Sequence, residues 1–490
     1  MGGFTRADLG FAAAMLVCGF LYWNLISLAS LGAGVSIFTM ILCIVISIYL
    51  KHGGIHQTRE SILCLVVVTL SAVNFPLYDN ITIKGLNFIF LSVSVVYYVC
   101  VLTRKRIEDK LTIFFIGDII NQLLIVPFYN FNCCFLGLKN GMIKNKHSKS
   151  FISALAGIII FLPVLVLVTT LLVDADAAFE RMINSIQFSL SAKMLEYIIQ
   201  IILGVPVACY LYGLVYGNRY KRHTDHITLE SINKNTKVFR FVPSVTVYSA
   251  LAALNGIYIL FFVSQASYLF SAFSNNIPGM MTYSEYARRG FFELCMVTGI
   301  NLAVIAIAHL ITNRGERIDT TKVMKIETAA LCLFTIMLIV TALSKMAMYI
   351  KYFGLTQLRV YTTWFMLVLL LVFVIIALRQ FKIFNGSKIV IISFVILFMF
   401  LCYGNVDGMI VKYNINRYVD GTLKTVDVNA LARLSDGAVP YMFQLYKDTD
   451  DENLKNNLKS AIIDQEDRER TFRDFNLQIY KGNQIRAMIR

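Results

Sequence analysis

The sequence contains few charged residues and few prolines for its length. Asp, Glu, Lys and Arg make up 15% of the 490 residues, and there are seven prolines. Soluble domains contain about 25% charged residues, and they do not need apolar runs near 20 residues long. Here hydrophobic residues make up 57% of the chain. The composition excludes a soluble enzyme, a disordered chain and a secreted disulfide scaffold, and it indicates a helical protein with many membrane spans.

The ten cysteines form no pattern that is typical of a metal site or a disulfide framework. No CxxC motif is present, and nearly all cysteines lie in apolar segments, where cysteine behaves as a small hydrophobe. The sequence also lacks the HExxH, GxSxG and P-loop motifs. We therefore expect no metal and no cofactor, identify no catalytic residue, and favour a protein that is not an enzyme.

Apolar segments long enough to cross a bilayer, which takes about 20 residues, recur along residues 1–404. The sequence predicts an all-α transmembrane bundle of eleven spans. They lie near residues 9–28, 32–50, 61–78, 86–102, 151–173, 194–216, 243–266, 290–312, 326–349, 362–378 and 388–404. Residues 103–150 are expected to be cytoplasmic or interfacial. Within them, 111–138 is apolar but interrupted by polar residues, so we interpret it as an amphipathic or re-entrant segment, with a twelfth span as the alternative.

Lys and Arg are distributed unequally between the two sides of this topology. With eleven spans, the N-terminus and loops of one side contain 24 of these residues, and the loops of the other side contain eight. Because basic loops face the cytoplasm, the N-terminus is expected inside and residues 405–490 outside. These last residues contain 13 basic and 13 acidic side chains. The net charge of +15 therefore reflects orientation and attraction to anionic lipid, which excludes nucleic-acid binding.

Residues 405–490, called the tail below, are expected to form a small extracytoplasmic helical domain. Asp427 is placed to cap one helix. Leucine and isoleucine at four-residue spacing mark another helix between residues 450 and 464. A last helix that contains Phe472 is expected to end at Gly482, since glycine commonly follows a helix.

Five segments together resemble one family of bacterial membrane proteins. They are DADAAFE (174–180), YSEYARRGFFEL (283–294), YFGLTQLRVY (352–361), YNINRY (413–418) and LSDGAVP (434–440). The family is the one catalogued as domain of unknown function 4173, with the 4153 grouping as a near neighbour. This resemblance covers roughly residues 150–480 and implies a multi-pass protein of the bacterial cytoplasmic membrane with an extracytoplasmic C-terminal segment. Because the family has no established activity, it implies no catalytic role for any residue.

On the predicted topology these segments lie on the outer side of the membrane. We predict a polar cluster on this face, covered by the tail; the alternative is that its charges are helix caps and ordinary interfacial pairs. The candidate residues are Asp174, Asp176, Glu180, Glu285, Arg288, Glu293, Arg359, Asp407, Asn414 and Arg417.

Glu293 and Lys345 reach similar depth in a hairpin of spans, and ionisable residues within spans usually pair. We predict that they form an ion pair; otherwise each extends to the headgroups.

Three classes of function remain open. The first is an envelope interaction or sensory-accessory protein that binds a partner protein through its outer face and tail. The second is a transporter of a small solute, which is less favoured because the ionisable residues lie near the span ends. The third is an enzyme that modifies envelope lipid or glycan and needs an outer acid or base. The sequence favours the first class, with membrane lipid and an envelope protein as partners and without nucleic acid.

Overall fold

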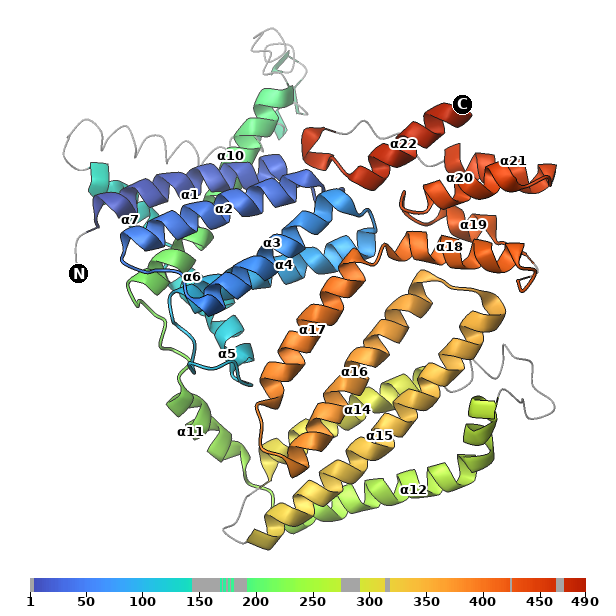
Figure 1. Cartoon of the computed structure of the whole chain (residues 1–490). Helices are drawn as coiled ribbons and strands as arrows, with labels where there is room; N and C mark the ends of the chain where they lie inside the picture. Colours follow the sequence, from blue (N-terminus) through green and yellow to red (C-terminus); the bar gives the residue numbers. More distant parts are fainter. Residues whose placement is uncertain are drawn as a thin grey trace.

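The chain folds into two groups of long helices and a helical tail (Figure 1). The computed structural model describes residues 4–142, 168–169, 171–172, 175–176, 178–179, 192–274, 291–312, 318–423, 425–463 and 471–490. These residues are almost entirely helical and contain no strand, which confirms the prediction of an all-α membrane bundle. Ten helices in the described ranges are long and apolar enough to cross a membrane, or eleven if one bent pair counts as a span.

The first group, which we call the N-terminal bundle, surrounds a core that includes Phe11, Ile46 and Tyr212. Its long helices are α1 (Arg6–Leu25), α2 (Ala33–His52), α3 (Arg59–Leu77), α4 (Ile81–Leu102) and α10 (Ala192–Arg219). Helices α1 and α10 cross at Gly19 and Gly204, where a Cβ on Gly204 would lie 2.7 Å from the backbone of Gly19. Glycine is required here because the two backbones touch.

The second group, which we call the C-terminal bundle, surrounds Leu331, Leu338 and Phe373. It consists of α12 (Ser244–Ser274), α14 (Phe291–Ile311), α15 (Ile318–Phe353), α16 (Gln357–Phe381) and α17 (Gly386–Tyr403). Helix α17 also contacts α3 and α4, so it joins the two bundles. The helices of both bundles coincide with the predicted spans to within a few residues, except α12 and α15, which are longer. The predicted span at 151–173 lies mostly outside the described residues.

A broken segment packs on the N-terminal bundle, and a short helix connects the two bundles. The broken segment comprises α5 (Phe115–Ile120), a π-helix (Asn121–Ile125), α6 (Val126–Tyr129) and α7 (Cys133–Met142), with a bend of 41° before α7. Its two ends contact residues at the same end of the N-terminal bundle: Gly117 lies beside Ile107, and Gly137 lies beside Phe4. That it does not cross the membrane stays a prediction. The short helix, α11 (Leu229–Phe239), lies between α10 and α12.

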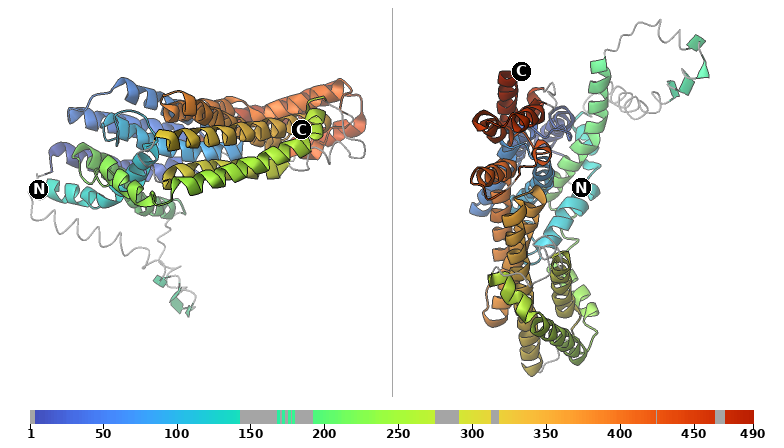
Figure 2. Two further views of the ribbon diagram at one scale, coloured as in Figure 1. Left: turned by 90° about the horizontal axis from the view of Figure 1, so that it is seen from below. Right: turned by 90° about the vertical axis from the view of Figure 1, so that its right-hand side faces the viewer.

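The tail has a core of its own, built from Val411, Val439, Met442, Leu458 and other apolar side chains. Its elements are α18 (Val406–Val419), α19 (Val428–Ala432), α20 (Val439–Asp448), α21 (Glu452–Ile463), the 3-10 turn η2 (Phe472–Asp474) and α22 (Leu477–Ile489). Figures 1 and 2 both place it at one end of the bundles, opposite the start of α12.

Two expectations about the tail have different outcomes. Asp427 caps α19 as predicted, because its carboxylate accepts a hydrogen bond of 3.0 Å from the backbone N–H of Ala430. The expected helix end at Gly482 is wrong, since α22 continues to Ile489. Gly482 is buried within this helix, and a Cβ there would lie 3.0 Å from the Asp436 carboxylate. This glycine permits a close approach between α22 and the segment before α20.

Candidate functional site

The tail is docked on the loops at one end of the N-terminal bundle, and we call this contact the junction. Asn476 is central to it and is 2% exposed. Its amide donates hydrogen bonds of 2.8 Å to the carbonyls of Phe75 and Tyr78, at the end of α3. Its carbonyl oxygen accepts from the N–H groups of Gln478 and Ile479, in the first turn of α22. One side chain therefore caps two helices, one from the bundle and one from the tail.

Further contacts of η2 complete the docking. The guanidinium of Arg473 donates to the carbonyl of Asn24 at 3.1 Å, near the end of α1. The N–H of Ala33 donates to the carbonyl of Phe475 at 3.0 Å, and the hydroxyl of Ser30 donates to Asp474. The loop between α1 and α2 thus has its polar groups satisfied by the tail rather than by water alone.

Asp407, in the first turn of α18, is the centre of a buried polar network beside the junction. It is 1% exposed, and its carboxylate accepts four hydrogen bonds. One oxygen accepts from the Asn80 amide at 3.0 Å and the Gln357 amide at 2.7 Å. The other accepts from the backbone N–H of Ser435 at 3.1 Å and its hydroxyl at 2.5 Å. Because hydrogen bonds to a carboxylate are strong, this network ties both bundles and the tail together.

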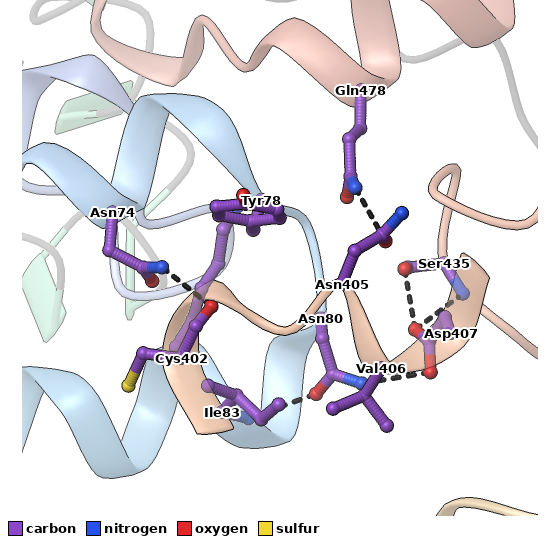
Figure 3. Close-up of a pocket in the computed structure, with 11 residues that line it drawn as sticks. Asn74, Tyr78, Asn80, Ile83, Cys402, Asn405, Val406, Asp407, Ser435 and Gln478 are labelled. Atoms are coloured by element: carbon purple, nitrogen blue, oxygen red, sulfur yellow. Dashed lines mark hydrogen bonds between the residues drawn. The ribbon is translucent and has the colours of Figure 1, made fainter. Parts of the chain in front are cut away.

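Local sequence explains how these groups are positioned. Asn80 is the N-cap of α4, and its carbonyl oxygen accepts from the N–H of Ile83, which leaves its amide to face Asp407. Asn405 has a φ of 42°, in the left-handed region that asparagine tolerates. This residue turns the chain between α17 and α18 and accepts a hydrogen bond of 2.8 Å from Gln478 (Figure 3). The same view shows Asn74 of α3 donating to the carbonyl of Cys402 at the end of α17.

Lys84 is buried on the first turn of α4 next to this network. Its ammonium lies 3.0 Å from the Asp79 carboxylate and donates to the carbonyl of Ser30 at 3.1 Å. A buried lysine is costly unless it is paired and hydrogen-bonded. Here its partners come from the loop between α1 and α2 and from the connection between α3 and α4, so Lys84 holds together the surface on which the tail rests.

An open cavity of about 340 Å³ lies between the bundle end and the tail. Its lining includes Ser27, Ser30, Asp79, Lys84, Gln357, Asp407, Arg433, Ser435 and Asp474. This volume is in the range of small-molecule sites. The four hydrogen bonds of Asp407 occupy its acceptor positions, so it is not a free acid or base. Arg433 is exposed and forms no ion pair within the described residues, so its guanidinium can donate to a solute.

Of the predicted outer residues, Asp407 lies in this site and three others lie beside the end of α15. The Arg359 guanidinium donates to the carbonyls of Phe353 and Gly354. Asn414 pairs with the backbone of Leu355, accepting at 2.7 Å and donating at 2.9 Å. Arg417 donates to the carbonyls of Ile350 and Lys351. These three side chains fasten the turn between α15 and α16, which is a capping role.

The remaining predicted residues are dispersed or lie outside the described residues. Asp176 is exposed and accepts from the backbone of Ala178 and Phe179. Glu293 is exposed in the first turn of α14, and Lys345 is half-buried on α15. Their ion pair stays a prediction. The positions outside the described residues are Asp174, Glu180, Glu285 and Arg288.

Several residues of the site were missed by sequence reasoning. Gln357 and Ser435 lie in segments that carried the family resemblance, but they are not among the candidate residues, which are all charged except Asn414. Asn80 and Lys84 precede the predicted start of a span at residue 86, where they look like ordinary flanking residues. The usable signal was Asp79-Asn80, a capping pair followed four residues later by a lysine at the edge of an apolar run.

Comparison with known proteins identifies a family but no activity. No curated protein and no solved structure matches the chain. Residues 62–445 match the family described as Domain of unknown function (DUF4153). This is the grouping that the sequence suggested as a near neighbour, in place of the 4173 family that it suggested first. The match includes Asn80, Gln357, Asp407 and Ser435, and it extends over more than half of the chain. The chain is therefore a member of the DUF4153 family.

Proposed function

We propose that this protein is an envelope interaction protein with a sensory-accessory role, which binds a partner protein through its tail. The observation that carries the proposal is the junction, where buried polar groups hold a folded tail against the bundle in one orientation. A tail that served only as a tether would need no such contacts. A docked tail presents a fixed surface, which lowers the entropy lost when a partner binds.

The exposed surface of the tail supports a protein partner. Phe472 of η2 and Tyr480 and Met488 of α22 are large side chains that remain exposed. Aromatic residues and methionine are enriched in protein interfaces. The distribution of Lys and Arg supports an extracytoplasmic tail in the bacterial cytoplasmic membrane, so the partner would be a protein of the envelope.

The cavity supports the sensory part of the proposal. Lys84 and Asp79 come from the bundle, whereas Arg433 and Asp474 come from the tail, and all four line the same space. A small polar solute bound there would contact both parts, so its binding would stabilise the docked state. The tail surface would then respond to the presence of that solute.

Polar groups inside the C-terminal bundle favour this function over transport. Tyr258 donates to Asn301 at 2.7 Å, and Asn301 donates to Thr335 at 2.9 Å, which links α12, α14 and α15. These mid-span groups bind one another, as expected for helix packing. In a transport path, such groups would be available to a solute.

Photo-crosslinking tests the proposal in native membranes. The photoreactive residue p-benzoylphenylalanine is placed at Phe472 or Tyr480 in the tail, and at Phe381 as the control. Phe381 is also exposed but lies at the opposite end of the molecule. We expect one envelope protein to crosslink at the two tail positions and not at the control position, and we expect it to co-purify with the unmodified chain. Adducts with lipid alone, or the same adducts from all three positions, would refute binding through the tail.

A further inference from the structure

Helix α11 lies at the end of the bundles opposite the tail and bridges them. Figure 1 shows it running across the neighbouring long helices rather than alongside them. At its start, the side chain of Ile232 lies close to Gly117 of α5. After its end, the N–H of Val242 donates to the carbonyl of Ile311 at 3.3 Å, where α14 finishes. Both ends are thus held at the level where spans of the two bundles terminate.

The sequence around α11 forms a defined helix start. The N–H of Thr228 donates to the Ser231 hydroxyl at 3.0 Å, and the N–H of Ser231 donates to the Thr228 hydroxyl at 3.2 Å. This reciprocal arrangement satisfies two backbone donors at the start of the helix. The local sequence therefore specifies where α11 begins.

The second half of α11 and the following turn expose large apolar side chains. Val238 is 72% exposed, Phe239 is 52% exposed and Phe241 is 72% exposed. Apolar and polar residues in α11 also recur with the period of a helix. A patch of this kind at the level of the span ends would be costly in water, and the boundary between headgroups and acyl chains would cover it.

The charge of this segment is positive. Residues 220–243 contain Lys221, Arg222, Lys234, Lys237 and Arg240, against Asp225 and Glu230. Lys234 is exposed on α11 and forms no ion pair with any residue that the structure describes. A zwitterionic lipid would cover the apolar residues but would not compensate these cations.

We propose that α11 is an interfacial helix that binds anionic phospholipid headgroups. The apolar residues 238–241 enter the top of the acyl region, and Lys234 with the basic residues around it attracts phosphate groups. Charge complementarity and the position at the span ends favour lipid over a protein partner or a second copy of the chain. Because α11 joins α10 to α12, the lipid would also stabilise the connection between the two bundles.

Tryptophan fluorescence in vesicles tests this proposal on the full chain. The two native tryptophans, Trp23 and Trp364, are replaced by phenylalanine, and Phe239→Trp places a single probe on α11. The protein is reconstituted in vesicles that contain phosphatidylcholine and phosphatidylglycerol, with bromine near the top of the acyl chains of one lipid or the other. A matched chain with Tyr480→Trp reports on the exposed surface of the tail.

We expect the emission of the Phe239→Trp chain to be quenched more by brominated phosphatidylglycerol than by brominated phosphatidylcholine at equal mole fraction. Neutralising one basic residue lowers the local enrichment of an anionic lipid by up to about fivefold, so Lys234→Gln should reduce the difference between the two lipids. Lys388→Gln, an exposed lysine at the start of α17, should leave it unchanged. Salt should reduce the preference as well.

Two results would overturn the proposal. Equal quenching by both brominated lipids would show that the helix contacts acyl chains without selecting anionic headgroups. Water-like emission with no quenching, as expected for the Tyr480→Trp chain, would show that lipid does not cover residues 238–241.

Discussion

Replacing Asn476 by alanine should undock the tail without unfolding it. The substitution removes two hydrogen bonds to the carbonyls of Phe75 and Tyr78, and it also removes the N-cap of α22. Each buried hydrogen bond contributes about 0.5–1.5 kcal/mol, and a lost cap costs about 0.5–2 kcal/mol. We therefore expect the free energy of opening at the junction to fall by about 2–4 kcal/mol. The core of the tail contains no atom of Asn476 and should remain intact.

Amide hydrogen exchange measures this opening directly. Two N–H groups of the bundle donate across the junction and are protected only while the tail is docked: that of Ala33, to the carbonyl of Phe475, and that of Asp79, to the side chain of Gln478. A loss of 2–4 kcal/mol corresponds to exchange that is about 30- to 1,000-fold faster at these amides. Amides in α20 should exchange at nearly the same rate as before, because the tail core still holds them.

Asn453→Ala is the matched control for this measurement. Asn453 is exposed in α21, away from the junction, so its removal should leave all of these amides unchanged. If Asn476→Ala accelerates exchange no more than the control does, Asn476 does not hold the tail to α3. If α20 exchanges as fast as the junction, the tail unfolds when it undocks, and Asn476 does not act on docking alone.

Two further substitutions test the packing at and away from the junction. Asp407→Asn presents an amide N–H₂ group to donors that now face a carboxylate oxygen, so we expect the free energy of tail docking to fall by about 2–4 kcal/mol. The resistance of the tail to protease during heating should fall as a result. Asp420→Asn, at the exposed end of α18, should have no effect. Gly204→Ala forces α1 and α10 apart and should destabilise the bundle by about 1–3 kcal/mol. Gly256→Ala adds the same methyl group where nothing lies within 4 Å, so equal melting curves for the two glycine variants would contradict the close crossing.

Much of the fold follows from the sequence because each span is specified locally. A run of about 20 apolar residues forms a helix in a bilayer whatever its neighbours are, since backbone groups must bond within the segment. Helix caps are also specified by the local sequence, as the cap formed by Asp427 shows. Gly482 shows where local rules fail: the residue that usually ends a helix here allows two segments to touch, and that contact is set by the tertiary structure.

The candidate site was predicted only in part, since its polar groups come from distant points of the chain. Asp407 has the same sequence signal as Arg359 and Arg417, a charged residue beside a span. Its network with Asn80 joins residues 327 positions apart. Arg359 and Arg417 instead bind backbone carbonyls at the end of α15, six and 66 positions away. The spacing of residues along the chain therefore does not show which charged side chain binds a distant side chain and which one hydrogen-bonds to the backbone at a helix end.

The junction also determines when this end of the molecule can be completed during biosynthesis. Ser30 and Asp474 are 444 positions apart, and Arg473 and Asn24 are 449 apart. Helices α1 and α2 therefore enter the membrane long before their partners in η2 have been synthesised. Closing so long a loop is entropically costly and slow, so we expect the loop between α1 and α2 to remain hydrated until the tail arrives. Docking of the tail would then be a late event of assembly. A chain with a docked tail would already have both bundles in the membrane.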